Sequence, residues 1–191
     1  KKIPIGAGMG GGSSDGAAAL LAFNTIYDFK LTQEELFSLA LKIGSDASYF
    51  IDPRPKYATS RGEIFEPISL IIDRPILIVN PGIHISTSWA FGKAGTRVPK
   101  FRLSQIGSED HKGLSFLKDR VTNDFESIVF KEYPEIRKIK EQLYECGAEF
   151  ALMTGSGSTV FGIFTEITQA HNAALKFPSN YFTFIDDQAA K

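Results

Sequence analysis

The feature that most constrains this chain is a run near its start, in which five of the seven residues from Gly6 to Gly12 are glycine. A short apolar stretch, Ile3-Pro4-Ile5, precedes the run, and an alanine- and leucine-rich stretch follows it. Glycine inside a regular element is destabilising, so this run needs a reason. Glycine permits close backbone approach, and the first turn of a helix carries unpaired N–H groups and roughly half a positive charge. Together these features predict an anion site, most naturally for phosphate.

Two common nucleotide motifs fit the run poorly. Residues 6–11 formally match G-x-G-x-x-G, but the acidic residues expected about 20 positions on, Glu34 and Glu35, fall at the start of a capped helix. A P-loop needs a lysine after its glycines, and none follows here. A plain flexible surface turn is the remaining alternative, and the strong helix that follows at once argues against it.

Capping signals and hydrophobic periodicity predict a mixture of helices and strands. Thr32 and Glu35 form a capping box for a helix that Gly44 ends. We expect further helices from Ser14, at about 114–130, at 134–146 and near 166–176, strands at 56–60, 63–68, 75–82, 149–153, 159–164 and 181–185, and a polar loop at 95–113. This irregular order favours an α+β fold over a doubly wound sheet.

The composition excludes several function classes. The net charge of −1 offers no basic footprint for nucleic acid, and no apolar run has membrane-spanning length. The only cysteine, Cys146, continues the apolar stripe of Ile136, Ile139 and Leu143, which predicts a core position and no internal disulfide. These properties predict a cytoplasmic protein without nucleic-acid or membrane partners.

Three segments, in order, resemble motifs of the GHMP kinases: "IPIGAGMGGGSSDGAAALLAFN", "GSDASYFI" and "TGSGSTVFGIF". "RGEIFEPI" and "NPGIHISTSWAF" are also similar to one branch of that family, so the resemblance covers nearly the whole chain. It implies a two-domain α+β architecture. Residues 1–73 would be the rear part of the family's N-terminal, ATP-phosphate-binding domain, and residues 74–191 a ferredoxin-like C-terminal domain.

The resemblance also implies ATP and Mg²⁺ as cofactors, with the phosphates held by Gly8, Gly10, Gly11, Gly12, Ser13 and Ser14. The hydroxyl of Ser14 would assist Mg²⁺, and Gly155 and Gly157 would support the phosphate loop from a second glycine-rich loop. The alternative for Ser13 and Ser14 is a simple helix N-cap. The alternative for the second loop is an ordinary hairpin turn.

Asp46 corresponds to the aspartate that acts on the acceptor hydroxyl in the family, as general base or orienting acceptor. From its spacing alone, an N-cap or Asx-turn would be the simpler interpretation. The neighbouring residues depart from the branch's pattern at Ser45, Ala47, Ser48 and Tyr49. These departures put the local fit in doubt more than the role of the aspartate.

The similar branch phosphorylates the 2-hydroxyl of 4-diphosphocytidyl-2-C-methyl-D-erythritol in isoprenoid precursor synthesis, which implies diphosphocytidyl methylerythritol as the small-molecule substrate. Another GHMP kinase of mevalonate or sugar type, or a non-catalytic nucleotide-binding module, are the alternatives. His84 and Thr87 follow a strand end and could reach this substrate, although a surface-loop histidine is the safer interpretation.

The family has several tens of residues before the phosphate loop, including a lysine near the acceptor hydroxyl, and these have no counterpart here. We therefore expect the chain alone to lack kinase activity and to expose apolar surface. An open strand edge of this kind invites association with a second copy, so we also expect a homo-oligomer.

Overall fold

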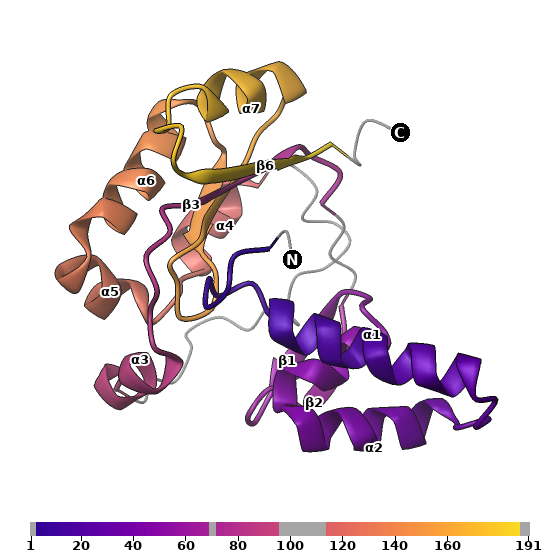
Figure 1. Ribbon diagram of the computed structural model, residues 1–191. Coiled ribbons are helices and arrows are strands. Elements are labelled where there is room, and N and C mark those ends of the chain that lie inside the picture. Colours follow the sequence, from indigo (N-terminus) through magenta and orange to yellow (C-terminus); the bar gives the residue numbers. More distant parts are fainter. Residues whose placement is uncertain (1–2, 69–71, 96–113, 188–191) are drawn as a thin grey trace. The chain divides into compact units, whose positions relative to one another are not determined.

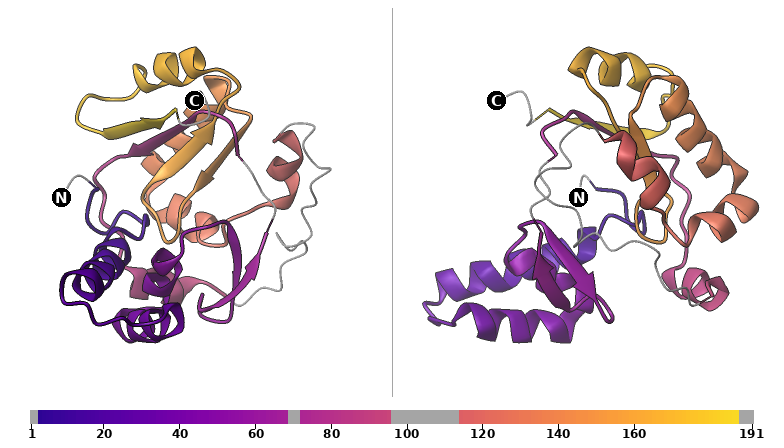
Figure 2. Two further views of the ribbon diagram at one scale, coloured as in Figure 1. Left: turned by 90° about the vertical axis from the view of Figure 1, so that its right-hand side faces the viewer. Right: turned by 180° about the vertical axis from the view of Figure 1, so that it is seen from behind.

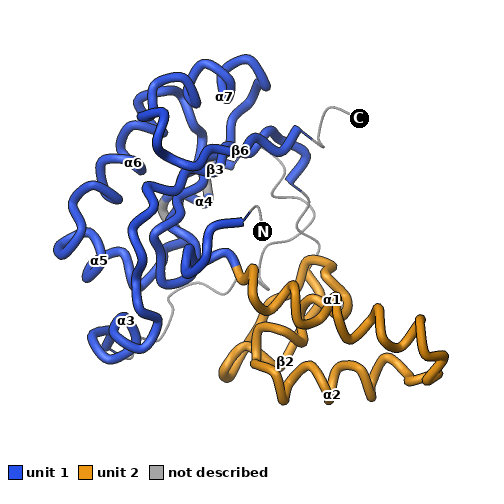
Figure 3. Tube along the Cα trace, in the orientation of Figure 1, with its two compact units in different colours: residues 1–9, 71–102, 108–191 blue, residues 10–70, 103–107 orange. Residues whose placement is uncertain are grey.

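The computed structural model describes residues 3–68, 72–95 and 114–187. The chain divides into two compact units, coloured separately in Figure 3. Unit 2 consists of residues 10–68, and unit 1 contains residues 3–9 together with 72–95 and 114–187. The expected domains, 1–73 and 74–191, stay a prediction about family architecture, because compactness groups residues 3–9 with the C-terminal part.

Unit 2 is built on two helices, α1 (Gly11–Ile26) and α2 (Gln33–Ile43), which pack side by side (Figure 1). The capping box predicted for α2 is confirmed: the Thr32 hydroxyl accepts from the amide of Glu35, whose carboxylate accepts from the amide of Thr32. Gly44 ends the helix as predicted. Helix α1 starts at Gly11, three residues before the expected start. Among the described helices, none is both long and apolar enough to cross a bilayer.

A short 3-10 helix and a hairpin complete unit 2. The 3-10 helix η1 (Ser45–Ile51) packs against both α1 and α2. Strands β1 (Lys56–Thr59) and β2 (Ile64–Pro67) pair antiparallel around a turn that contains Arg61 and Gly62, as predicted.

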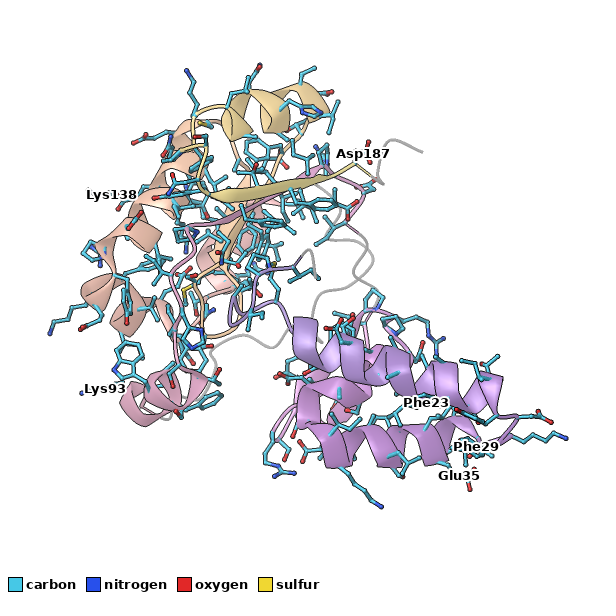
Figure 4. The ribbon with its side chains drawn as sticks, in the orientation of Figure 1. Phe23, Phe29, Glu35, Lys93, Lys138 and Asp187 are labelled. Carbon is cyan, nitrogen blue, oxygen red and sulfur yellow. The ribbon has the colours of Figure 1, made fainter. Side chains whose placement is uncertain are left out.

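Helix α1 buries little of its apolar surface within unit 2. Ala17 is its only buried residue, while Phe23 and Ile26 are exposed. The rings of Phe23, Tyr27 and Phe29 contact one another at the end of the unit where α1 runs into the link to α2 (Figure 4). This end of unit 2 therefore presents an aromatic surface.

Unit 1 is a four-stranded antiparallel sheet with the order β4-β5-β3-β6 (Figure 2). Its elements are β3 (Ile76–Asn80), α3 (Thr87–Lys93), α4 (Ser115–Arg120), α5 (Glu126–Glu132), α6 (Pro134–Glu145), β4 (Phe150–Met153), β5 (Val160–Ile163), α7 (Ile167–Ala174) and β6 (Phe182–Asp186). Helices α3 to α6 lie between β3 and β4 in the chain, and α7 connects β5 to β6. The strand order matches the ferredoxin-like domain that the sequence predicts.

One face of this sheet carries the core. Leu77 and Val79 of β3 are fully buried and alternate with partly exposed neighbours. They form one cluster with Leu143 of α6 and Ala170 of α7, which shows that both helices cover the same face. Cys146, expected in the core, is half-buried at the edge of this cluster and is not in a disulfide.

The helix predicted at about 114–130 is wrong, because two short helices, α4 and α5, occupy this region. The chain leaves the helical conformation at Val121 and re-enters it after Phe125. Between them, the Asn123 side chain accepts from the amide of Phe125 and donates to backbone carbonyls far along the chain. These bonds replace those that a continuous helix would make. The polar loop expected at 95–113 lies, apart from Gly95, outside the described residues.

Shortening a buried leucine in unit 1 should cost much more stability than shortening an exposed one. Leu143 is 0% exposed and Leu175, at the end of α7, is 82% exposed. Leu143→Ala should lower the free energy of unfolding by about 2–5 kcal/mol, because it leaves a cavity in the packed core. The control Leu175→Ala should change it by less than about 0.5 kcal/mol. Urea unfolding followed by circular dichroism measures both, and equal losses would contradict this core.

Candidate functional site

In unit 1, the segment that carries Gly8 packs directly on the loop between β4 and β5. Gly8 has a φ of +73°, and a Cβ at this position would lie 2.4 Å from the carbonyl oxygen of Thr154 and 2.8 Å from that of Gly157. Only glycine allows this contact. The Thr154 hydroxyl donates to the Gly8 carbonyl at 2.8 Å, and the amide of Thr159 donates to the Ala7 carbonyl at 3.3 Å. The structure thus brings three predicted site residues together: Gly8, Gly155 and Gly157.

The loop between β4 and β5 is fixed by a buried polar network, unlike a plain hairpin turn. Asn80, at the end of β3, is 1% exposed and donates to the hydroxyls of Ser158 at 3.1 Å and Thr159 at 2.9 Å. Its side-chain oxygen accepts from the amide of Gly82 at 2.8 Å. The Ser158 hydroxyl in turn donates to the carbonyl of Ile83. No local signal in the sequence marks the role of Asn80, because its hydrogen-bond partners are 78 and 79 positions away.

His84 and Thr87 also reach these two segments. The imidazole of His84 occupies the space where Gly6 lacks a side chain, since a Cβ there would lie 2.1 Å from Nδ1. Thr87, the first residue of α3, places its hydroxyl 3.4 Å from that of Ser156. Both residues that the sequence suggested for substrate contact therefore lie beside the glycine-rich segments of unit 1.

In unit 2, the start of α1 has the character of an anion site. Gly10 is the N-cap, with a left-handed φ of +62°, and no side chain in the described structure caps the helix. The first turn contains no acidic residue that would compete for its N–H groups. A helix start of this kind attracts anions through its unpaired N–H groups and its dipole.

Gly11, Gly12, Ser13 and Ser14 all lie in the first turn of α1. The interpretation of Ser13 or Ser14 as N-cap is therefore wrong, since Gly10 holds that position and accepts from the amide of Ser14 at 2.9 Å. No described atom lies within 4 Å of the place where Gly12 would carry a Cβ. Packing within the chain does not require glycine at position 12, whereas close approach of a ligand would.

Asp46 is the second residue of η1 and is exposed. Gly44 is the N-cap of this 3-10 helix, so the interpretation of Asp46 as an N-cap is wrong. The buried Ser48 next to it donates to the carbonyl of Ser45 at 2.7 Å and holds the turn. A Cβ on Gly62, in the hairpin turn, would lie 3.5 Å from the Asp46 carboxylate. Asp46 and the start of α1 belong to the same packed group, because the ring of Phe50 in η1 lies against Gly10.

Two cationic side chains that follow Asp46 in sequence are paired with another carboxylate. The Arg54 guanidinium bonds both carboxylate oxygens of Asp52, and Lys56 lies 3.0 Å from one of them. These bonds, that of Arg54 first, hold the pKa of the Asp52 carboxyl far below its usual range. The backbone amide of Glu63 is the largest cause that lowers the pKa of the Glu63 carboxyl.

The part of the chain that the structure describes has no group of three or more His, Cys, Asp or Glu side chains placed to hold a metal ion. The hydroxyls of Ser13 and Ser14, in the first turn of α1, are oxygen donors of the kind that Mg²⁺ accepts beside substrate phosphates.

Comparison with family models places both ends of the chain in one family. Residues 1–52 match the GHMP kinases N-terminal domain, and residues 111–183 match the GHMP kinases C-terminal domain. The first match contains the glycine run and Asp46, and the second contains the loop between β4 and β5.

Individual relatives agree with this result. A protein of Chlorobium phaeobacteroides named 4-diphosphocytidyl-2-C-methyl-D-erythritol kinase is 40% identical over 188 residues, which is 95% of this chain and 65% of that protein. A crystal structure of 4-(cytidine 5'-diphospho)-2C-methyl-D-erythritol kinase superposes with a TM-score of 0.78 and 29% identity, over 97% of this chain and 67% of the other. The homoserine kinase of Cytophaga hutchinsonii shares the fold at a TM-score of 0.77 and 15% identity, over the same shares of the two chains.

The chain is shorter than these relatives. It spans 60–65% of the length of the first curated relatives that it matches. More than a third of the length of each of these relatives therefore lies outside the match.

Two glycine substitutions should distinguish packing from ligand approach. Gly8→Ala should lower the free energy of unfolding by about 1–3 kcal/mol, because its Cβ would overlap the Thr154 carbonyl. Gly12→Ala should instead raise helix stability by less than about 1 kcal/mol, since its site is open but lies in the first turn, where the helix-interior penalty of glycine does not apply in full. It should nevertheless weaken binding of ATP, the anion that the resemblance predicts.

Urea unfolding and calorimetric titration with Mg²⁺ and ATP measure the two effects on the complete protein. Equal destabilisation by both substitutions would contradict the packing of Gly8. Unchanged ATP affinity in Gly12→Ala would remove Gly12 from the anion site.

Proposed function

Because this chain belongs to the GHMP kinase family, we propose that the complete protein transfers the γ-phosphate of ATP to the 2-hydroxyl of 4-diphosphocytidyl-2-C-methyl-D-erythritol. The observation that carries this proposal is the 40% identity, over 95% of the chain, to a protein with that kinase name. The uncapped, glycine-rich start of α1 supports it independently, because a triphosphate is the kind of anion such a helix start binds. We place the enzyme in the cytoplasm, in isoprenoid precursor synthesis.

The phosphate-binding part would be the segment from Gly8 to Ser14. Backbone N–H groups at Gly10, Gly11 and Gly12 and in the first turn would bind phosphate oxygens, with the hydroxyls of Ser13 and Ser14 nearby. Bound Mg²⁺ would neutralise charge that develops on the phosphates during transfer. We assign Ser14 as its protein ligand. Gly155 and Gly157 support this segment by packing against Gly8.

Asp46 would act on the acceptor. Its exposed carboxylate, fixed on η1, can accept the proton of the substrate 2-hydroxyl as that oxygen bonds to the γ-phosphorus. The bond between this phosphorus and the bridging oxygen of ATP breaks, and ADP leaves with that electron pair. Positioning and electrostatic stabilisation supply most of the catalysis in phosphoryl transfer. The fixed positions of the Asp46 carboxylate on η1 and of the phosphate-binding groups on α1 therefore matter.

Two other functions are weaker candidates. A different GHMP small-molecule kinase would share the fold, as the homoserine kinase does, but its 15% identity carries the fold alone. A non-catalytic nucleotide-binding module would need no acceptor-side carboxylate, and Asp46 argues against it. We also propose that residues 1–73 and 74–191 correspond to the family's two domains, and that a second copy can pair through an exposed edge.

Substrate specificity tests the assignment directly. The complete protein should release ADP only when Mg²⁺, ATP and a diphosphocytidyl polyol are all present, because the relatives' acceptor carries that group by name. A coupled ADP-release assay measures turnover. Mevalonate, galactose and homoserine serve as competing acceptors, and equal turnover with any of them would overturn the assignment.

Asp46→Asn should reduce kcat by roughly 10²–10⁴-fold and leave the affinity for ATP nearly intact, because the group acts mainly in the transition state. Asp28→Asn is the matched control, since Asp28 is exposed and its ion pair among the described residues is with the exposed Lys30, at 3.4 Å. Steady-state kinetics with ATP titration separate the two parameters. If Asp46→Asn keeps more than half of the wild-type kcat, Asp46 is not the proton acceptor.

A further inference from the structure

We infer that Asn123, Glu126 and Lys140 form a bracket that positions the phosphate-binding segment, although none of the three lies in it. This inference rests on the proposed function for its kinetic consequence, but its structural part stands on contacts within unit 1. None of the three lies in a segment that resembles a GHMP kinase motif. We call them the Asn123–Glu126 bracket.

Asn123 contributes two bonds to the end of β4. Its side-chain amide donates to the carbonyl of Met153 at 2.7 Å and to that of Gly155 at 2.8 Å. The opposite atom, Oδ1, accepts from the amide of Phe125 at 2.9 Å, which fixes the orientation of the amide group. A single side chain thus spans the point at which β4 ends and the glycine-rich loop begins.

Glu126 bonds the same residue, Met153, but as a hydrogen-bond acceptor instead of a donor. Its Oε1 accepts from the amide of Met153 at 3.0 Å, so both polar backbone groups of Met153 are bonded by the bracket. Lys140 of α6 donates to both oxygens of Glu126, at 2.8 and 2.7 Å. The side chains of Glu126 and Lys140 are only 13% and 20% exposed, which makes this ion pair stronger than a typical surface pair.

The bracketed loop in turn holds Gly8. Thr154 and Gly155, which follow Met153, provide the hydroxyl bonded to the Gly8 carbonyl and the backbone that packs against Gly8. Gly8 is two residues before the N-cap of α1 in sequence. A shift of the loop would therefore move the start of the phosphate-binding segment. Asn123 and Glu126 are positioning residues on this argument and do not contact the nucleotide.

The kinetic signature follows from this indirect role. A displaced segment should weaken nucleotide binding in the ground state and the transition state alike, so KM for ATP should rise while kcat is kept. Asn123→Ala removes two hydrogen bonds and should raise KM for ATP by roughly 3- to 30-fold.

Asn123→Asp separates this role from simple packing. Aspartate has nearly the same shape but cannot donate, and its carboxylate would face two carbonyl oxygens. If Asn123 only fills space, Asn123→Asp should behave like the wild type. The bracket predicts that it raises KM for ATP at least as much as Asn123→Ala.

The test uses the complete protein, with steady-state kinetics and amide hydrogen exchange in the absence of nucleotide. Asn123→Asp, Asn123→Ala and Glu126→Gln should all speed exchange at Thr154, Gly157 and Thr159, whose amides are bonded within the loop or to Ala7. Lys140→Met keeps the Asn123 bonds and should give a smaller effect of the same kind if the other variants fail to fold. Lys138→Met is its control, because Lys138 is exposed on the outer side of α6 (Figure 4).

Wild-type exchange and KM in the folded variants would overturn the inference while the proposed kinase activity stood. If the wild-type protein shows no turnover, the proposed function is overturned. The hydrogen-exchange rates of the variants would then still test whether the Asn123–Glu126 bracket holds the loop. Equal effects of Lys138→Met and Lys140→Met would also count against it.

Discussion

The structure depends on one close backbone contact, between Gly8 and the loop that joins β4 to β5. The carbonyl oxygens of Thr154 and Gly157 lie where any other residue at position 8 would carry its Cβ. The Thr154 hydroxyl then reaches the Gly8 carbonyl across 146 positions of sequence. Through this contact the first residues of the chain become part of the ferredoxin-like unit, and the predicted phosphate-binding segment starts from a fixed point.

The sheet explains why this loop can be held so firmly. Val79 of β3 pairs with Val160 of the antiparallel strand β5, so Asn80, which follows Val79, and Thr159, which precedes Val160, meet at the same end of the sheet. The loop before Thr159 is thereby tied to β3 on one side. Asn123 and Glu126 tie its other end, at Met153, to α5. Gly155 and Gly157 in this loop have left-handed backbone conformations. The loop is nevertheless bonded at both of its ends to neighbouring elements.

Local signals in the sequence were sufficient for much of the fold. The capping box at Thr32, the hairpin turn at Gly62 and the apolar strand β3 each depend on residues a few positions apart, so the sequence predicts them directly. The break between α4 and α5 could not, because the Asn123 bonds that favour it lead to residues about 30 positions away. The role of Asn80 could not be predicted for the same reason. In the candidate site, the roles of the glycine run and of Asp46 stay predictions. The N-cap position of Gly10 was not predicted, because the ring of Phe50 that lies against it is far away in sequence.

The glycine run combines two different physical requirements within five residues. At Gly8 the space of a side chain is filled by the chain's own backbone, so glycine stabilises the fold there. At Gly12 the corresponding space is open, and alanine would have the higher helix propensity, by at most about 1 kcal/mol. Selection for stability alone would replace Gly12 but retain Gly8. The presence of both is therefore best explained if position 12 serves an interaction with something other than the chain, and the uncapped first turn of α1 makes a phosphate the most suitable partner.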